Sequence, residues 1–420
     1  MTAKAMCGLA ALLLVATLAH GLGAGFCLDF DGGSEYGQTE SNQVGDSFTI
    51  EAWVRTTDSY PGSDFTEGAP LVFGDVVGPA HDFGTSILNG RFAFGVGNGV
   101  AGGEQTIVST TAVNTGHWVH VAAVRDGSTG VIRVYVNGFE EASLSTGDTS
   151  TLGDAPNLRV ARNAEGTRAF VGAFDEVRIW NVARSETEIR SNMCRKVDVS
   201  EPGLRNYFSF DYRRLGKTID ISPPMNNLFT YNLEPDDWEW SGAFVGDESV
   251  IAYQPSTSLS ISHPDGDQLS ISSITGSPAA VHLIRVDGPA NLQIPPSGFC
   301  SVDPLRQWGV FFVGGTSPSF DLTLSYAGYP EIADENLLGL ASRSHNADEL
   351  WADTGASPDT AADTLNLSAE AGSRFYAMTT VDTFDNITTG SGRALVFDGR
   401  NQYARVDRDV ASSFTLEAWI

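Results

Sequence analysis

At 420 residues, the chain is too long for a single hydrophobic core, so two or more domains are expected. It carries 52 acidic and 25 basic residues, for a formal net charge of −27. This acidity argues against nucleic acids and anionic membranes as partners, because both bind to a basic face.

The first 25 residues have the pattern of a secretory signal peptide. Lys4 supplies a positive charge, an apolar run covers Leu9 to Leu18, and small residues at 23–25 precede Phe26. The apolar run is too short to span a bilayer, and no later segment is long and apolar enough to do so. The sequence therefore predicts a secreted, extracellular protein whose mature part begins near residue 26, with cleavage after Ala19 as an alternative.

The rest of the chain predicts an all-β fold. Short alternating segments are separated by Gly, Asn-Gly and Asp-Gly turns at the spacing typical of a β-sandwich. Residues 48–55 alternate apolar and other side chains, and Asn137-Gly138 and Asp265-Gly266 predict β-hairpins. A further hairpin is predicted where the strands near 308–313 and 320–326 are joined by a glycine-containing turn.

Residues 26–195 contain five motifs in an order known from one family. These are FDGGSEY, FTIEAWV, GHWVHVAAVRD, IRVYVNG and FVGAFDEVRIWNVARSETEI, and in the last of them Ser185 and Glu188 form a capping box that predicts a short helix. Together they resemble the LamG-like (laminin G, concanavalin A-like) jelly-roll family. The resemblance implies two stacked antiparallel sheets in which the first and last strands are neighbours.

Five segments are predicted along the chain. They are a signal peptide at 1–25, a LamG-like jelly-roll domain at 26–200, a connector at 201–245, a β-sandwich spacer at 246–388, and the truncated start of a second LamG-like domain at 393–420. The last segment repeats the opening of the first domain, because SFTLEAW at 413–419 matches SFTIEAW at 47–53. Two strands do not close a jelly roll, so the chain is expected to be a fragment of a longer, repeat-bearing protein.

A calcium site is predicted from the resemblance and from two aspartates. Asp175 shares its alternation phase with apolar neighbours, and burying an unpaired carboxylate costs several kcal/mol. Asp31 lies where the first strand enters Gly32 and Gly33, whose carbonyls are free to turn outward. Adjacent first and last strands would bring Asp31, Gly33 and Asp175 together as oxygen ligands for Ca²⁺, which this family often binds. The alternative is that Asp31 caps a turn and Asp175 pairs with an arginine.

The same implied adjacency predicts a disulfide between Cys27, before the first strand, and Cys194, after the last. In the chain-entropy model a bond closing so long a loop contributes about 4–5 kcal/mol. The alternatives are that Cys300 pairs with one of them or that all three thiols stay reduced.

The sequence contains no recognisable catalytic constellation. The acids Asp236, Asp237 and Glu239 come nearest to a catalytic pair, but they follow a proline in the connector and are expected in a polar loop. Glu51 alternates with apolar residues and Glu176 has no partner acid two or four positions away.

The predicted function is that of a secreted binding or adhesion module, with a glycan or an extracellular protein as partner and Ca²⁺ shaping the site or the fold. Exposed aromatic rings would stack on sugars, but most are expected in the core, so no sugar-binding residue is assigned. Two alternatives stay open: accessory modules of an exported polysaccharide hydrolase with its catalytic domain beyond Ile420, and a passive stalk.

Overall fold

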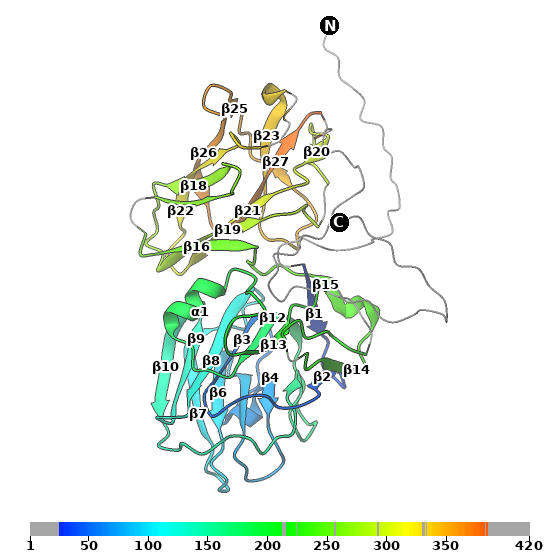
Figure 1. The fold of residues 1–420 in the computed structure, drawn as a ribbon, viewed down its shortest axis with the longest axis vertical. Helices are drawn as coiled ribbons and strands as arrows, with labels where there is room; N and C mark the ends of the chain where they lie inside the picture. The colour runs from blue at the N-terminus through cyan, green and yellow to red at the C-terminus, as the bar shows by residue number, and fades with distance from the viewer. Residues whose placement is uncertain are drawn as a thin grey trace, which may run out of the picture. The chain divides into compact units, whose positions relative to one another are not determined.

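The computed structural model describes residues 25–384, except 212–215, 224, 256–257, 292–293, 330–331, 333 and 383. Apart from Gly25, the predicted signal peptide lies outside the described residues, and so does the predicted second LamG-like segment at 393–420. The described strands form four antiparallel sheets, named A to D below (Figure 1).

The first two sheets enclose one core. Sheet A has the order β10 (Phe139–Ser145), β9 (Val131–Val136), β8 (Val119–Asp126), β3 (Phe48–Arg55), β12 (Gly172–Trp180), β1 (Phe26–Phe30) and β15 (Trp238–Trp240), with β13 (Leu204–Phe208) also on β12. Sheet B has the order β14 (Leu228–Tyr231), β2 (Tyr36–Thr39), β11 (Arg159–Val160), β4 (Ala69–Gly74), β5 (Phe83–Leu88), β6 (Arg91–Val96) and β7 (Gln105–Ala112). Their inward side chains form a single apolar cluster. The predicted all-β sandwich is confirmed.

The other two sheets form a second sandwich. Sheet C has the order β16 (Glu248–Tyr253), β19 (Ala280–Val286), β21 (Gln307–Val313), β27 (Arg374–Thr380), β23 (Leu338–Arg343) and β24 (Ala352–Asp353), with β20 (Ser301–Val302) beside β27. Sheet D has the order β17 (Leu259–Ser262), β18 (Gln268–Ser272), β22 (Ser319–Ser325), β26 (Thr364–Ala371) and β25 (Pro358–Asp359). Because β21 and β22 lie in different sheets, the hairpin predicted between them is wrong; the chain crosses from one sheet to the other there.

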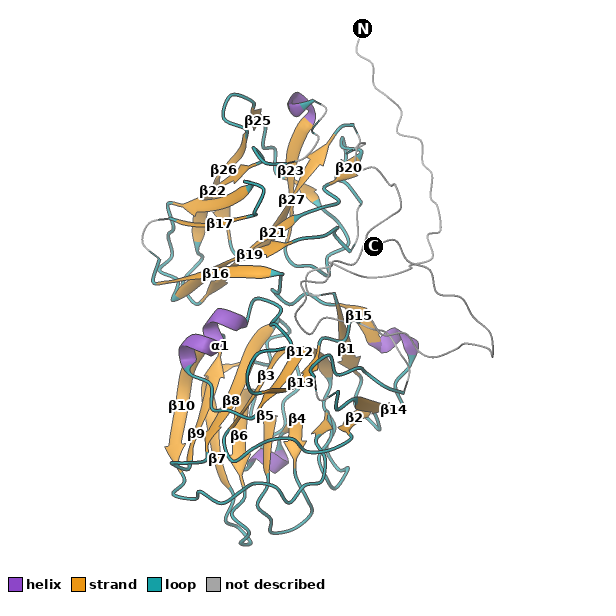
Figure 2. Cartoon of the chain, in the orientation of Figure 1, coloured by secondary structure: helices purple, strands orange, loops and turns teal. Residues whose placement is uncertain are grey.

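Local signals in the sequence account for several elements. Asn137 and Gly138 have positive φ angles of 48° and 81° and join β9 to β10 in the predicted hairpin. The helix α1 (Glu186–Asn192) begins with the predicted capping box of Ser185 and Glu188. The other helical segments, drawn in purple in Figure 2, are the 3₁₀ turns η1 (Phe65–Glu67), η2 (Pro235–Asp237) and η3 (Glu335–Leu337).

The segment predicted as a connector completes the first sandwich. Its strand β13 pairs with β12, β14 pairs with β2, and β15 pairs with β1. A boundary at residue 200 therefore falls inside the structural unit. The described part of the chain contains no helix with the length and hydrophobicity of a membrane span.

A β-bulge in β12 changes which side chains face the core. Asp175 pairs with Trp53 and Arg178 with Glu51, so β12 has one residue more than β3 between these pairs. Glu176, in this bulge, has a φ of 52°. After the bulge, the odd-numbered residues Val177 and Ile179 point into the core of the first sandwich. Before the bulge, the even-numbered residues of β12 point into that core.

The outer face of sheet A packs against the outer face of sheet C. Trp53 on β3 is fully buried, and its ring centroid lies 5.4 Å from that of Phe311 on β21. Phe244 stacks on Phe311 at 4.8 Å and on Phe375 at 5.3 Å. Alternation explains this arrangement, because along β21 Trp308, Val310 and Phe312 point into the second core while Phe311 and Val313 point into this shared layer.

Two histidines are buried in the shared layer. The Nε2 atom of His120 on β8 lies 3.7 Å from a carboxylate oxygen of Glu51, and its ring lies 5.7 Å from that of Trp53. The ring centroid of His282 on β19 lies 6.2 Å from that of Phe311. Neither ring nitrogen of His282 has a hydrogen-bond partner among the described residues. Burial, with the positive charges of Arg178 and Arg184 and the neighbouring His282, lowers the pKa of His120, and burial lowers the pKa of His282 to about 3.

Replacing Phe311 by Ala should destabilise both sandwiches together, because its ring fills the layer that they share. We expect a loss of about 3–5 kcal/mol in the free energy of unfolding, the usual cost of deleting a buried phenylalanine ring. Differential scanning calorimetry should show one transition that shifts as a whole. The control Phe229→Ala removes a ring that is 37% exposed and should change the transition little. Two transitions, with only one shifted, would contradict the shared layer.

Acid should weaken the fold through the buried histidines. Their pKa values are lower in the folded chain than the ordinary value of about 6.5, so their contribution is complete above pH 6.5 and is lost as the pH falls toward 3. Between pH 7 and pH 5, the free energy of unfolding of His282→Phe should fall by about 2 kcal/mol less than that of the parent. Urea titrations at both pH values measure this. His117→Phe, at an exposed histidine, should follow the parent; parallel losses in His282→Phe and the parent would refute the assignment.

Candidate functional site

The structure does not bring the predicted calcium ligands together. Phe30 pairs with Gly172 and Leu28 with Phe174, so the register places Asp175 beside Cys27. Four residues separate that position from Asp31, which is about 13 Å along a strand. Asp31 and Gly33 are exposed in the turn after β1, where Glu35 accepts a hydrogen bond of 2.8 Å from the backbone N–H of Asp31.

Asp175 is instead satisfied inside the protein. One carboxylate oxygen accepts a hydrogen bond of 2.6 Å from the hydroxyl of Ser241, and the other accepts one of 2.7 Å from the backbone N–H of Glu176. Complete burial, together with the charges of Glu176 and Asp211, raises the pKa of Asp175 well above its usual range. Both oxygens of Asp175 thus accept hydrogen bonds from the protein, and the strand register keeps Asp175 apart from Asp31 and Gly33.

Elsewhere, too, the described residues bring no three His, Cys, Asp or Glu side chains together in a metal-binding group. One carboxylate pair does form at the ends of β4 and β5, where Asp75 and Asp82 share a hydrogen bond. Burial and the neighbouring Asp75 raise the pKa of Asp82 to about 8, so the pair shares a proton at neutral pH. No pattern in the sequence marks this pair, because a loop separates its two members.

The predicted disulfide is not formed in the structure, which holds Cys27 and Cys194 as buried free thiols. The indole nitrogen of Trp53 donates a hydrogen bond of 2.7 Å to the carbonyl of Met193, so the segment that carries Cys194 runs over β3. Cys27 lies on β1, and β12 separates these two strands. Its thiol donates a long hydrogen bond of 3.6 Å to the carbonyl of Glu239. The strands β1 and β12 are adjacent, as expected. Cys194, which follows helix α1, lies over β3 and not beside Cys27 on β1.

Three of the acidic residues considered as catalytic candidates, Glu51, Glu176 and Glu239, form contacts within the fold. Glu51 accepts a hydrogen bond of 2.9 Å from the indole of Trp180, and Glu176 forms an ion pair with Arg178. Both carboxylates are at most 2% exposed. Glu239 pairs with Arg55 at 2.9 Å. These contacts explain the positions of the acids without a substrate.

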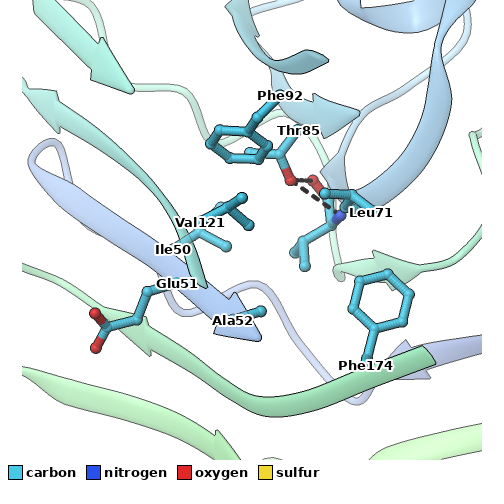
Figure 3. A pocket seen from close by; sticks show the side chains of 9 residues that line it. Ile50, Glu51, Ala52, Leu71, Thr85, Phe92, Val121 and Phe174 are labelled. Atoms are coloured by element: carbon cyan, nitrogen blue, oxygen red, sulfur yellow. Dashed lines mark hydrogen bonds between the residues drawn. The ribbon is translucent and has the colours of Figure 1, made fainter. Parts of the chain in front are cut away.

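A small gap in the first core is also structural. It has a volume of about 10 Å³, which is near the space of one water molecule, and lies between sheets A and B (Figure 3). Apolar side chains such as Ile50, Val121 and Phe174 line it, and Thr85, the polar group beside it, hydrogen-bonds with the backbone of Val72. A sugar ring does not fit there.

The outer face of sheet B carries a group of aromatic side chains, which we call the aromatic platform: Tyr36, Phe229 and Tyr231. Strand alternation creates it. Leu228 and Thr230 on β14 are buried, whereas Phe229 and Tyr231 point away from the core and are 37% and 39% exposed. Tyr231 pairs directly with Tyr36 on β2, so their side chains stand on the same face. Figure 1 shows β14 beside β2.

The rings of the two tyrosines stack on each other, face to face. Their ring centroids are 4.5 Å apart and their planes differ by 11°. The guanidinium carbon of Arg162 lies 5.4 Å from the centroid of the Tyr36 ring, and the ammonium of Lys217 lies 5.9 Å from that of Phe229. Exposed aromatic surface of this kind, next to polar groups, is typical of a binding face.

Backbone contacts fix the rim of the platform. The carbonyl of Ser34 accepts one hydrogen bond of 3.1 Å from Arg162 and another of 2.9 Å from the amide of Asn232. Gln38 stands on the same face between Phe229 and Arg159, and no described residue accepts or donates a hydrogen bond to its side-chain amide. A ligand on this face therefore meets rings, cations and one amide that is free to bond.

The platform is not evident from the sequence, because two of its three rings, Phe229 and Tyr231, lie in the predicted connector. The signal that identifies it is the alternation of Leu228, Phe229, Thr230 and Tyr231, which has the period of a half-buried strand. Its pairing with β2, almost two hundred residues earlier, is a property of the folded chain alone.

Comparisons with known proteins identify the first sandwich. Residues 31–190 match the family model described as the concanavalin A-like lectin/glucanases superfamily. No curated protein matches the chain in sequence.

Three solved structures are similar to this chain in fold alone. One, solved as a candidate carbohydrate-binding protein from Bacteroides ovatus, is 22% identical; the match covers 54% of this chain and 62% of that one, with a TM-score of 0.41. The sialidase module CBM40 of Ruminococcus gnavus, bound to α2,3-sialyllactose, is 17% identical, with 40% and 97% covered and a TM-score of 0.32. Domains LG4–5 of the mouse laminin α1 chain are 12% identical, with 87% and 85% covered and a TM-score of 0.32.

The family match falls on the part of the chain where the LamG-like motifs were recognised, and the antiparallel sandwich is the fold that they imply. Over residues 31–190 the chain therefore matches the model of the concanavalin A-like lectin/glucanases superfamily, in agreement with the resemblance recognised in its sequence.

Proposed function

We propose that the chain is a carbohydrate-binding module and that the aromatic platform on sheet B is its binding face. The stacked pair of Tyr36 and Tyr231 carries this proposal, because Tyr231 is 39% exposed and the stacking on Tyr36 holds its ring in place on the outer face of sheet B. The family match supports it, since the family includes lectins.

The chemistry of the platform suits a sugar. One face of a pyranose ring is covered by C–H groups, which pack on an aromatic ring, while its hydroxyls need donors and acceptors at the edge. Tyr231 and Phe229 provide the rings, and the amide of Gln38 and the two tyrosine hydroxyls provide polar contacts. Other aromatic side chains of the first sandwich, such as Trp53, are buried and unavailable.

The extracellular location and the dependence on Ca²⁺ stay predictions. The proposed face contains none of the residues predicted as calcium ligands, so binding to it should not require the ion. A partner protein, a passive stalk and an accessory role beside a hydrolase are the alternatives that the binding experiment separates. A carbohydrate-binding module fits either an adhesin or an accessory role.

Tyr231→Ala should weaken glycan binding at least tenfold, because the substitution removes half of the stacked pair. The experiment is a glycan array with the full chain, in millimolar calcium and again with chelator, followed by calorimetric titration of the best ligand. The melting temperature should change little, since Tyr231 is 39% exposed.

The matched control is Tyr253→Ala, because Tyr253 is 42% exposed and lies on β16 of the second sandwich. This variant should bind as the parent does. Equal binding by Tyr231→Ala would place the site elsewhere. A folded parent that binds no glycan in either condition would favour a protein partner or a stalk.

A further inference from the structure

The aromatic platform carries positive charge in a strongly acidic protein. Arg162 lies against Tyr36 and Lys217 against Phe229, at 5.4 Å and 5.9 Å from the ring centroids. Of the three lysines in the chain, Lys217 is the one that accompanies an exposed aromatic ring of this face. The two cations therefore stand on both sides of the surface that a sugar would cover.

Neither charge is neutralised by the protein. Within the described residues, no carboxylate oxygen comes within 4.0 Å of the side-chain nitrogens of Arg162 or Lys217. The guanidinium of Arg162 is held instead by two carbonyls, donating to Ser34 at 3.1 Å and to Gly166 at 3.1 Å. Carbonyls orient the guanidinium without cancelling its charge, so it is preorganised for an anion.

A third cation stands on the same face but is partly compensated. Arg159 pairs with Gln38 across the sheet and donates to the carbonyls of Asn163 and Ala164 at 3.1 Å and 2.7 Å. Burial raises the pKa of the nearby Asp75 and the charge of Arg159 opposes this rise, which means that the two groups already interact. The free positive charge of the platform is thus concentrated at Arg162 and Lys217.

From this charge distribution we infer that the platform selects an anionic saccharide, one whose sugar rings carry carboxylate groups. The inference rests on the proposed function. The sugar rings would contact the aromatic platform of Tyr36, Tyr231 and Phe229. A carboxylate of the saccharide would pair with Arg162 or Lys217. A neutral glycan would leave both cations unpaired and gain stacking alone, so charge decides between ligands that the rings do not distinguish.

The test compares one oligosaccharide in two forms, by calorimetric titration with the full chain. The first form is an oligomer of hexuronic acid, and the second is the same oligomer with its carboxyl groups methyl-esterified. The acid form should bind at least tenfold more tightly, and its affinity should fall as sodium chloride rises from 50 to 500 mM. A third arm, an oligosaccharide without carboxyl groups that carries sulfate esters, distinguishes carboxylate recognition from general anion binding.

Two variants locate the effect. Arg162→Gln and Lys217→Gln should each lower the affinity for the acid form about tenfold and leave the affinity for the ester unchanged. Arg162→Gln also removes the hydrogen bond to the carbonyl of Ser34, whereas Lys217→Gln tests the effect of charge without that loss. The control is Arg374→Gln, because Arg374 in the second sandwich is also held by a carbonyl and should not affect binding.

The outcomes separate the two proposals. Equal affinity for both forms, with no effect of either variant, would overturn the anionic preference and keep the carbohydrate-binding function. Tighter binding of the sulfated oligosaccharide than of the hexuronate would also overturn the preference for carboxylates. Absence of binding to all three, by a folded chain that also binds no glycan on the array, would overturn the proposed function itself.

Discussion

The burial of the outer face of sheet A is the constraint on which the molecule depends. This face carries Trp53 and the ion-paired side chains of Glu51 and Arg178, and none of them is more than 1% exposed. An indole and a salt bridge at such positions are stable only when a second layer excludes water and satisfies the polar atoms. Helix α1, the loop of Ser241 and sheet C provide that layer. Sheet B is then the sheet whose outer face is left to carry a ligand.

Much of the fold could be predicted because its signals are local. The alternation of β3 identifies the side that enters the core, since Phe48, Ile50, Ala52 and Val54 all belong to one cluster. The Asn137-Gly138 hairpin and the capping box of Ser185 depend on backbone preferences of a few adjacent residues. In each case, the sequence neighbours that make the prediction are also the structural neighbours.

The rest depends on contacts between distant segments. The bulge at Glu176 reverses the phase of β12, so the alternation that linked Asp175 to Val177 in the sequence does not hold in the fold. Register then separates Asp175 from Asp31, and the hydroxyl that satisfies Asp175 comes from Ser241 in a segment with no visible relation to it. The aromatic platform could not be predicted for the same reason, because β14 and β2 meet only after folding. The predicted calcium ligands Asp31 and Asp175 lie apart because the register between β1 and β12 is set by the folded sheet and not by a local signal.

The three strands contributed by residues 204–240 also decide where the module can be divided. A polypeptide that stopped at residue 200 would leave β1 and β2 as open edges, with backbone N–H and C=O groups ready to pair with another molecule. It would also leave the carboxyl group of Asp175 without the hydroxyl of Ser241, and it would expose Trp53. Such a fragment is a template for aggregation, although it contains every motif of the family. The unit that evolution could duplicate or shuffle intact is correspondingly larger than the region by which the family is recognised.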